Sequence, residues 1–184
     1  MKRIAPAVLI ALLALAGGLA PLHAGVDIFM KVTGITGESN DVNHRGWIDV
    51  TSFTHGLSNS SAASGGAGGG GSSKVAHASF DVSKYLDKSS LPLNLKVNQG
   101  SHVDSVIVEF QTTGANKSIF YRVTMTDVVI VNTNIKGETG DSRITDGISM
   151  VYKKIVWEYW PIDSNGKLGP VVRTEWDVSA NAGG

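Results

Sequence analysis

Hydrophobic and polar residues alternate along much of the chain after residue 25, which is the pattern of β-strands that bury one face. The first such stretch places Ile28, Met30 and Val32 on one face and Phe29 and Lys31 on the other. The same alternation recurs in three later stretches: residues 106–110, 119–126 and 154–159. The spacing therefore predicts a mainly β protein.

Turn-forming residues separate these stretches at regular intervals. They fall in four segments: residues 34–40, 113–116, 136–140 and 163–166. Residues 128–131, Val-Val-Ile-Val, are apolar on both faces, which predicts a strand covered on both sides. Short strands joined by such turns are typical of a β-sandwich or a β-barrel.

Residues 90–100 carry signals for two kinds of element. Four apolar residues alternate with polar ones, as they would in a strand: Leu91, Leu93, Leu95 and Val97. Helix punctuation is also present, because Ser90 can cap a helix, Pro92 suits a first turn and Gly100 suits the position after a helix end. Periodicity alone favours the strand.

The first 24 residues have the pattern of a signal peptide. Lys2 and Arg3 precede an apolar run of about sixteen residues, and small residues follow before Gly25. The alternative is a membrane span, but a span needs about twenty apolar residues. We therefore expect cleavage between Ala24 and Gly25, one mature domain over residues 25–184, no membrane insertion, and a periplasmic or extracellular location.

Residues 59–74 form a Gly/Ser tract that is expected to be a flexible loop between two strands. Too few apolar side chains are present to order the tract by burial. It does not match a nucleotide-binding loop, because Lys74 follows Ser73 rather than a glycine and no apolar helix comes next.

Charge and composition exclude several classes of function. The full chain has 16 basic and 16 acidic residues, and loss of Lys2 and Arg3 leaves a formal charge of −2. A nucleic-acid partner is not expected, because such proteins present a basic face to phosphates. The absence of cysteine excludes disulfides, thiolate nucleophiles and zinc–thiolate sites.

No catalytic, cofactor-binding or metal-binding constellation is found in the sequence. Four histidines lack metal-ligand spacing and are expected at turns or on the surface: His44, His55, His77 and His102. Residues 163–166 predict a hairpin turn on Asn-Gly rather than a calcium loop, whose glycine comes sixth. Four tryptophans are expected to make core or subunit contacts rather than bind a ligand: Trp47, Trp157, Trp160 and Trp176.

The chain resembles the Hcp family, the haemolysin-coregulated proteins that form the inner tube of type VI secretion systems. The similar segments follow the family's order and spacing from residue 25 to residue 181: 27–39, 44–53, 84–102, 127–130, 154–159 and 166–178. The resemblance implies an Hcp-like β-barrel or sandwich of two antiparallel sheets with one flanking helix, over residues 91–99. The leader is a departure, because tube proteins of this family carry no signal peptide.

The resemblance implies a structural protein, not an enzyme, whose partner is itself: hexameric rings stack into a hollow tube. The family's inter-ring loop corresponds to residues 59–74, so the candidate contact residues are Asn59, Ser64, Gly68, Ser73 and Lys74. Three functions stay open: a Sec-exported assembling protein, a conventional type VI tube that carries small effector proteins in its lumen below a spike protein, and a secreted β-sandwich that binds carbohydrate or acts as an enzyme.

Overall fold

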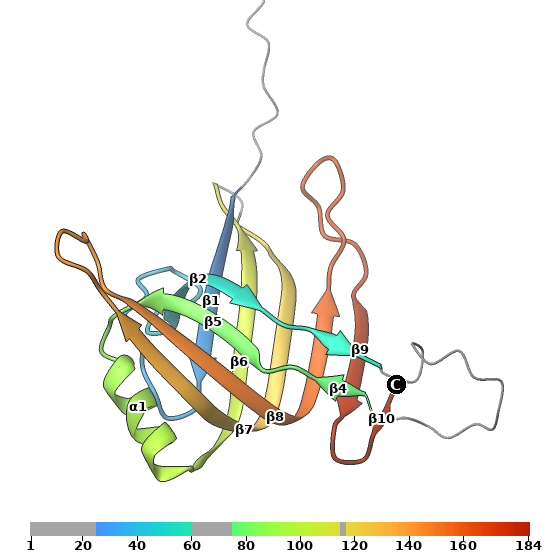
Figure 1. The fold of residues 1–184 in the computed structure, drawn as a ribbon. Helices are drawn as coiled ribbons and strands as arrows, with labels where there is room; N and C mark the ends of the chain where they lie inside the picture. The colour runs from blue at the N-terminus through green and yellow to red at the C-terminus, as the bar shows by residue number, and fades with distance from the viewer. Residues whose placement is uncertain (1–24, 60–74, 115–116) are drawn as a thin grey trace, which may run out of the picture.

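The computed structural model describes residues 25–59, 75–114 and 117–184. Within them the chain forms strands and a single helix, which confirms the expected mainly β fold (Figure 1). The elements are, in order, β1 Val26–Val32, β2 Ile48–Thr54, β3 Leu57–Ser58, β4 Ala76–His77, β5 Phe80–Tyr85, α1 Ser90–Gln99, β6 His102–Thr112, β7 Ile119–Lys136, β8 Thr145–Tyr159, β9 Val172–Asp177 and β10 Ala182–Gly183.

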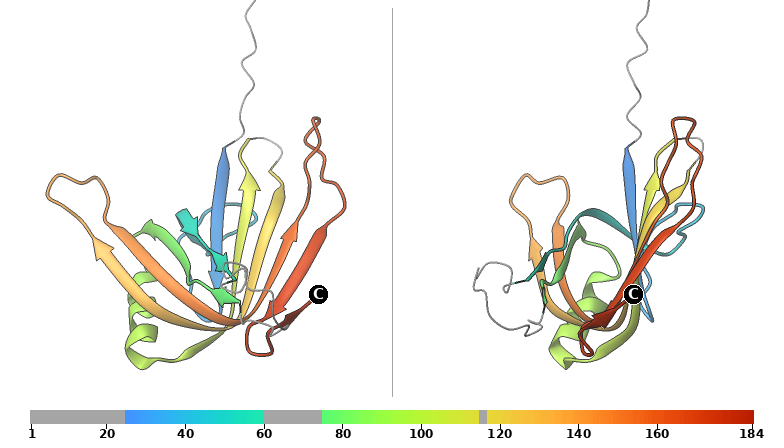
Figure 2. Two further views of the ribbon diagram at one scale, coloured as in Figure 1. Left: turned by 45° about the vertical axis from the view of Figure 1, so that its right-hand side comes forward. Right: turned by 90° about the vertical axis from the view of Figure 1, so that its right-hand side faces the viewer.

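Hydrogen bonding joins most of the strands into one antiparallel sheet that closes on itself. The sheet order is β10-β9-β8-β5-β2-β1-β6-β7, and β7 also pairs with β8, which closes a barrel (Figures 1 and 2). β8 changes its second neighbour along its length, because residues 145–150 pair with β5 and residues 154–159 pair with β9. The two sheets of the expected sandwich are thus one continuous surface, beside which β3 and β4 form a separate pair.

The predicted alternation is confirmed where one face of a strand lines the barrel interior. Met30, Val106 and Met125 are all fully buried. The expectation that residues 128–131 are covered on both faces is wrong: Val128 and Ile130 point into the core, whereas Val131 is 46% exposed. β7 is part of a barrel wall, and although α1 contacts this strand, it leaves Val131 open to solvent.

The helix α1 spans Ser90–Gln99, as the resemblance indicates and as the simple alternation does not. Gly100 ends it in the left-handed conformation, with φ of 57°, as expected of a glycine at this position. Ser90 does not cap the helix, because it is already helical and its hydroxyl accepts hydrogen bonds from Lys84 and from the Asp87 backbone. Ser89 occupies the cap position, and Asp87 accepts its N–H.

A buried cation joins the start of this helix to the barrel. Lys84 is fully buried, and its Nζ lies 2.7 Å from Asp87 Oδ1, 2.7 Å from Ser90 Oγ and 3.1 Å from Asp146 Oδ2. Asp146 is also fully buried, and its contact with Lys84 is an ion pair without hydrogen-bond geometry. One ammonium group therefore pairs with carboxylates from two segments, the turn before α1 and the start of β8.

We expect Lys84→Met to lower the free energy of unfolding by about 3–5 kcal/mol, because it leaves buried carboxylates without a cation. Lys88→Met is the matched control, since Lys88 is exposed, and it should change stability by no more than about 0.5 kcal/mol. Urea unfolding of both variants measures the difference. Equal stability of the two variants would contradict the structural role of the Lys84 cluster.

Candidate functional site

The candidate loop is carried by a short two-stranded ribbon, which we define as residues 55–59 and 75–78. In it, β3 pairs with β4, and the Ala78 N–H donates a 3.0 Å hydrogen bond to the Gly56 carbonyl. Of the candidate contact residues, Asn59 is exposed at the end of the ribbon. The other four candidates lie outside the described residues: Ser64, Gly68, Ser73 and Lys74. Ala24 of the expected cleavage site also lies outside them.

The ribbon contacts the barrel through a tyrosine hydroxyl that two histidines share. Tyr152 Oη on β8 lies 2.6 Å from His55 Nε2 and 2.9 Å from His77 Nδ1. The two histidines stand on opposite arms of the ribbon, so one hydroxyl ties both arms to the wall. Figure 1 shows the ribbon beside β9 and the C-terminal end of the chain.

Aromatic rings surround this contact. The His77 ring stacks on Trp176 of β9 with a centroid distance of 6.4 Å, and the His55 ring lies 6.2 Å from Trp157. Between the ribbon and the barrel lies a cavity of about 220 Å³, lined by Leu57, Val75, His77, Trp157, Thr174, Glu175 and Trp176. The cavity is small and mostly apolar, with two tryptophans in its wall.

The four tryptophans do not form one cluster. Trp157 and Trp176 pack against the hydrophobic core, as expected of core contacts. Trp160 lies under the guanidinium of Arg122 at 5.3 Å, and Trp47 contacts the edge of His44. Trp157 and Trp176 line the cavity beside the ribbon, whereas Trp47 lines a different hollow.

His44 lies in the turn segment between β1 and β2, one of the two positions expected for it, but its side chain is buried rather than at the surface. It is 0% exposed, and its ring stacks on Phe29 at 4.1 Å. Nδ1 lies 2.9 Å from Asp41 Oδ1, and Nε2 lies 2.8 Å from Glu109 Oε2. This network also buries Phe29, which alternation assigned to the polar face of β1.

The charges around His44 extend outward along β6, β7 and β8. Arg122 Nε lies 2.6 Å from Glu109 Oε1, and Lys117 pairs with Asp41. Burial acts to raise the pKa of Asp41, but hydrogen bonds from Lys117, His44 and the Asn43 backbone together lower it well below its usual range. The network is closed to solvent at the imidazole, so its role is to hold the β1–β2 connection against β6.

Among the described residues, no group of three or more His, Asp or Glu side chains is placed to hold a metal ion. His102 is exposed and pairs with Asp127. No helix in the part of the chain that the structure describes has the length and apolar character needed to cross a membrane.

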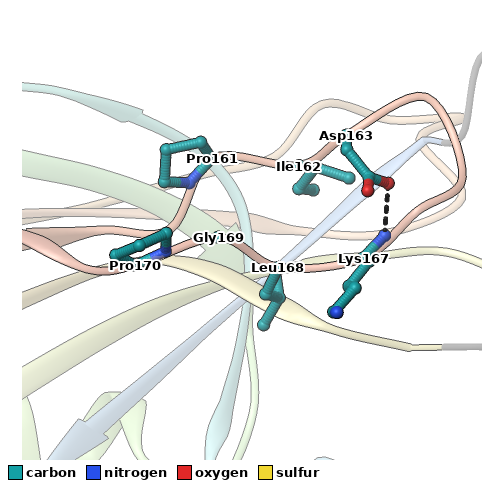
Figure 3. A pocket seen from close by; sticks show the side chains of 7 residues that line it. All are labelled: Pro161, Ile162, Asp163, Lys167, Leu168, Gly169 and Pro170. Carbon is teal, nitrogen blue, oxygen red and sulfur yellow. Dashed lines mark hydrogen bonds between the residues drawn. The ribbon is translucent and has the colours of Figure 1, made fainter.

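The turn at residues 163–166 is a hairpin turn, as predicted. Asp163 Oδ1 accepts N–H groups from Asn165 and Lys167, and Gly166 has a positive φ of 79°. Figure 3 shows the open hollow along this hairpin, lined by Pro161, Ile162, Asp163, Lys167, Leu168, Gly169 and Pro170. The carboxylate of Asp163 in this hollow accepts two backbone N–H groups of the turn through Oδ1.

The comparisons with known proteins agree with this architecture. The family described as "Type VI secretion system effector, Hcp" matches residues 29–159. The chain belongs to the Hcp family. Protein hcp1 of Pseudomonas aeruginosa is 30% identical over 158 residues, which is 85% of this chain and 97% of that protein.

Solved structures of Hcp proteins share the fold. A structure described as a type six secretion system protein superimposes with a TM-score of 0.82 at 29% identity, covering 87% of this chain and all of the other. Hcp1 from Salmonella typhimurium has a TM-score of 0.70 at 22% identity, covering 86% and 98% of the two chains. The Hcp fold of this chain therefore spans nearly all of residues 25–184.

Proposed function

We propose that this Hcp chain is a structural subunit, without enzymatic activity, that assembles into hexameric rings and that these rings stack into a hollow tube. The observation that carries the proposal is the match over 97% of a curated Hcp protein together with the closed barrel. In such an assembly the partner is a second copy of this chain, and neither a cofactor nor a nucleic acid takes part.

The surface of the single chain supports self-association. Within the described residues, β10 covers only the C-terminal part of β9, so the outer edge of residues 172–174 has no strand neighbour. Val172 on this edge is 63% exposed, and Leu91 and Leu95 on one face of α1 are 72% and 53% exposed. Open strand edges and apolar side chains of this kind favour pairing with another copy.

We infer that the chain is exported through the Sec route and acts in the periplasm or outside the cell. The pattern of residues 1–24 supports export. Gly25 is already held in the fold, because its carbonyl accepts a 3.0 Å hydrogen bond from the Thr113 N–H. Cleavage before Gly25 would leave the hydrogen bonding of the barrel intact.

The family description favours a second candidate, a conventional type VI tube protein. In that case the tube would carry small effector proteins in its lumen and meet a spike protein at its end. Both candidates assemble in the same way, and they differ in the route by which the subunit leaves the cytoplasm.

Sec export predicts that the leader, residues 1–24, is removed from the exported protein. Protein recovered from the periplasm or the medium should begin at Gly25, because Ala24 is the small residue that ends the leader. N-terminal sequencing measures this directly. Recovery of chains that begin at Met1, or of protein in the cytoplasm alone, would contradict Sec export and favour the conventional tube.

Ring stacking is predicted to depend on the loop at residues 59–74. Replacing Ser64 to Ser73 by a short turn should abolish tubes and leave rings, because a loop that docks on the next ring contributes at each repeated contact around it. A loop that only connects strands would change closure entropy by less than about 1 kcal/mol when shortened. Electron microscopy of the mature protein counts rings and tubes.

Ring formation in the same preparation is the control, because it shows that the shortened chain has folded. Tubes at wild-type length and abundance in the shortened variant would overturn the stacking role of this loop.

A further inference from the structure

We propose that His55, His77 and Tyr152 form a pH-sensitive contact, the ribbon dock, which holds the ribbon against the barrel at neutral pH and releases it on acidification. The dock lies at the base of the loop proposed to reach the next ring, so its opening would change where that loop is presented. An effect of the dock on ring stacking rests on the proposed function. The pH-sensitive contact itself does not depend on that function.

The hydrogen bonds of the dock depend on the number of protons that it holds. A tyrosine hydroxyl donates one hydrogen bond, and a neutral imidazole has one donor and one acceptor nitrogen. With both histidines neutral, Tyr152 can donate to one ring and accept from the other, which satisfies both contacts, of 2.6 and 2.9 Å. One proton can also be accommodated, because the charged ring then donates to the hydroxyl.

A second proton removes the remaining acceptor. Both rings then present N–H donors to the same oxygen, the Tyr152 proton loses its partner, and two positive charges face each other across one hydroxyl. The doubly protonated dock is therefore unfavourable. In the released ribbon, both imidazolium rings can be hydrated and can separate.

The surroundings of the histidines act in the same direction. Burial, followed by the charge of His77, lowers the pKa of His55, and the carboxylate of Asp81 opposes this shift. Burial also lowers the pKa of His77. Glu175 lines the cavity beside His77, but it is already paired with Lys154 and Arg173.

These directions fix the sign of the pH dependence. The docked histidines bind protons less tightly than the released ones, so release takes up protons. The dock is fully favoured above the ordinary histidine pKa of about 6.5, and its stability falls as the pH drops below that value. For each unit by which the pKa of a histidine is lower in the docked ribbon than in the released ribbon, acid raises the equilibrium constant for release about tenfold.

Besides the dock, the ribbon contacts the barrel through its histidine rings: His55 lies 5.3 Å from Phe80 and 6.2 Å from Trp157, and His77 lies 6.4 Å from Trp176. β3 and β4 are two residues long each and form their own sheet, separate from the barrel sheet. Leu57, which lines the cavity, is 52% exposed. The same two histidines make the ring contacts and the hydrogen bonds to Tyr152, so charging them acts on both kinds of contact.

Nuclear magnetic resonance of the mature protein tests the dock. The ring resonances of His55 and His77 should titrate below the ordinary pKa, and Tyr152→Phe should move both toward it. Nuclear Overhauser contacts of the Tyr152 ring with the His55 and His77 rings should be present at pH 7.5 and lost at pH 5, because only the docked ribbon brings these rings together. In His77→Gln, which keeps a donor but cannot titrate, the loss of the Tyr152–His55 contact on acidification should shrink.

His102→Gln is the matched control, because His102 is exposed and pairs with Asp127 away from the ribbon. It should leave the pH dependence of the contacts of Tyr152 with His55 and His77 unchanged. Titration of His55 and His77 at the ordinary value, or Tyr152 contacts of equal strength at both pH values, would overturn the dock.

Electron microscopy at pH 7.5 and pH 5 separates the dock from its consequence. Shorter tubes in acid for the wild type, with a smaller change for His77→Gln, support regulation of stacking. Tubes of unchanged length while the dock opens would overturn that regulation. Absence of tubes at both pH values would count against the proposed function and not against the dock. The resonance titration tests the dock whether or not tubes form.

Discussion

The pairing of β7 with β8 is the constraint on which the rest of the structure depends. These are the longest strands of the chain, and they pair from Tyr121 with Tyr159 to Lys136 with Thr145. The register of this pair shifts between Ile130 and Asn132, so that Val131 is an extra residue on β7, and a bulge of this kind increases strand bending. Such bending allows the sheet to curl until its ends meet.

The change of neighbour along β8 follows from this closure and creates the site. Residues 145–150 of β8 pair with β5, which completes the barrel, and residues 154–159 pair with β9, which extends the sheet outward. Tyr152 stands in the intervening segment, where β8 leaves β5 and has not yet met β9. The hydroxyl of Tyr152 can therefore meet the ribbon, which continues from β2 and β5 past their paired ends. The position of the ribbon is thus a consequence of barrel geometry.

Local patterns predicted the local features of this fold. Alternation placed Val106 and Val108 in the core, and Gly100 marked the end of α1. Alternation could not decide the helix itself, since apolar residues at every second position fit a strand equally well, and the family resemblance decided it. Residues 128–131 were misread because composition does not reveal whether a second layer covers a strand.

The polar interactions could not be predicted because their partners are far apart in the sequence. His44 and Glu109 are 65 residues apart, and Tyr152 meets His77 across 75 residues. Only the Asp41–His44 spacing was a local signal for the buried network. The loop at residues 59–74 was identified by composition and by resemblance, and its contact with a neighbouring ring stays a prediction.

The mass of the assembled protein tests the central claim most directly. Native mass spectrometry of the mature chain, residues 25–184, at micromolar concentration and neutral pH counts the copies in each particle. Self-assembly into rings predicts a dominant species of six copies, together with multiples of six where rings stack. A single species of one copy, unchanged as the concentration rises tenfold, would contradict the account.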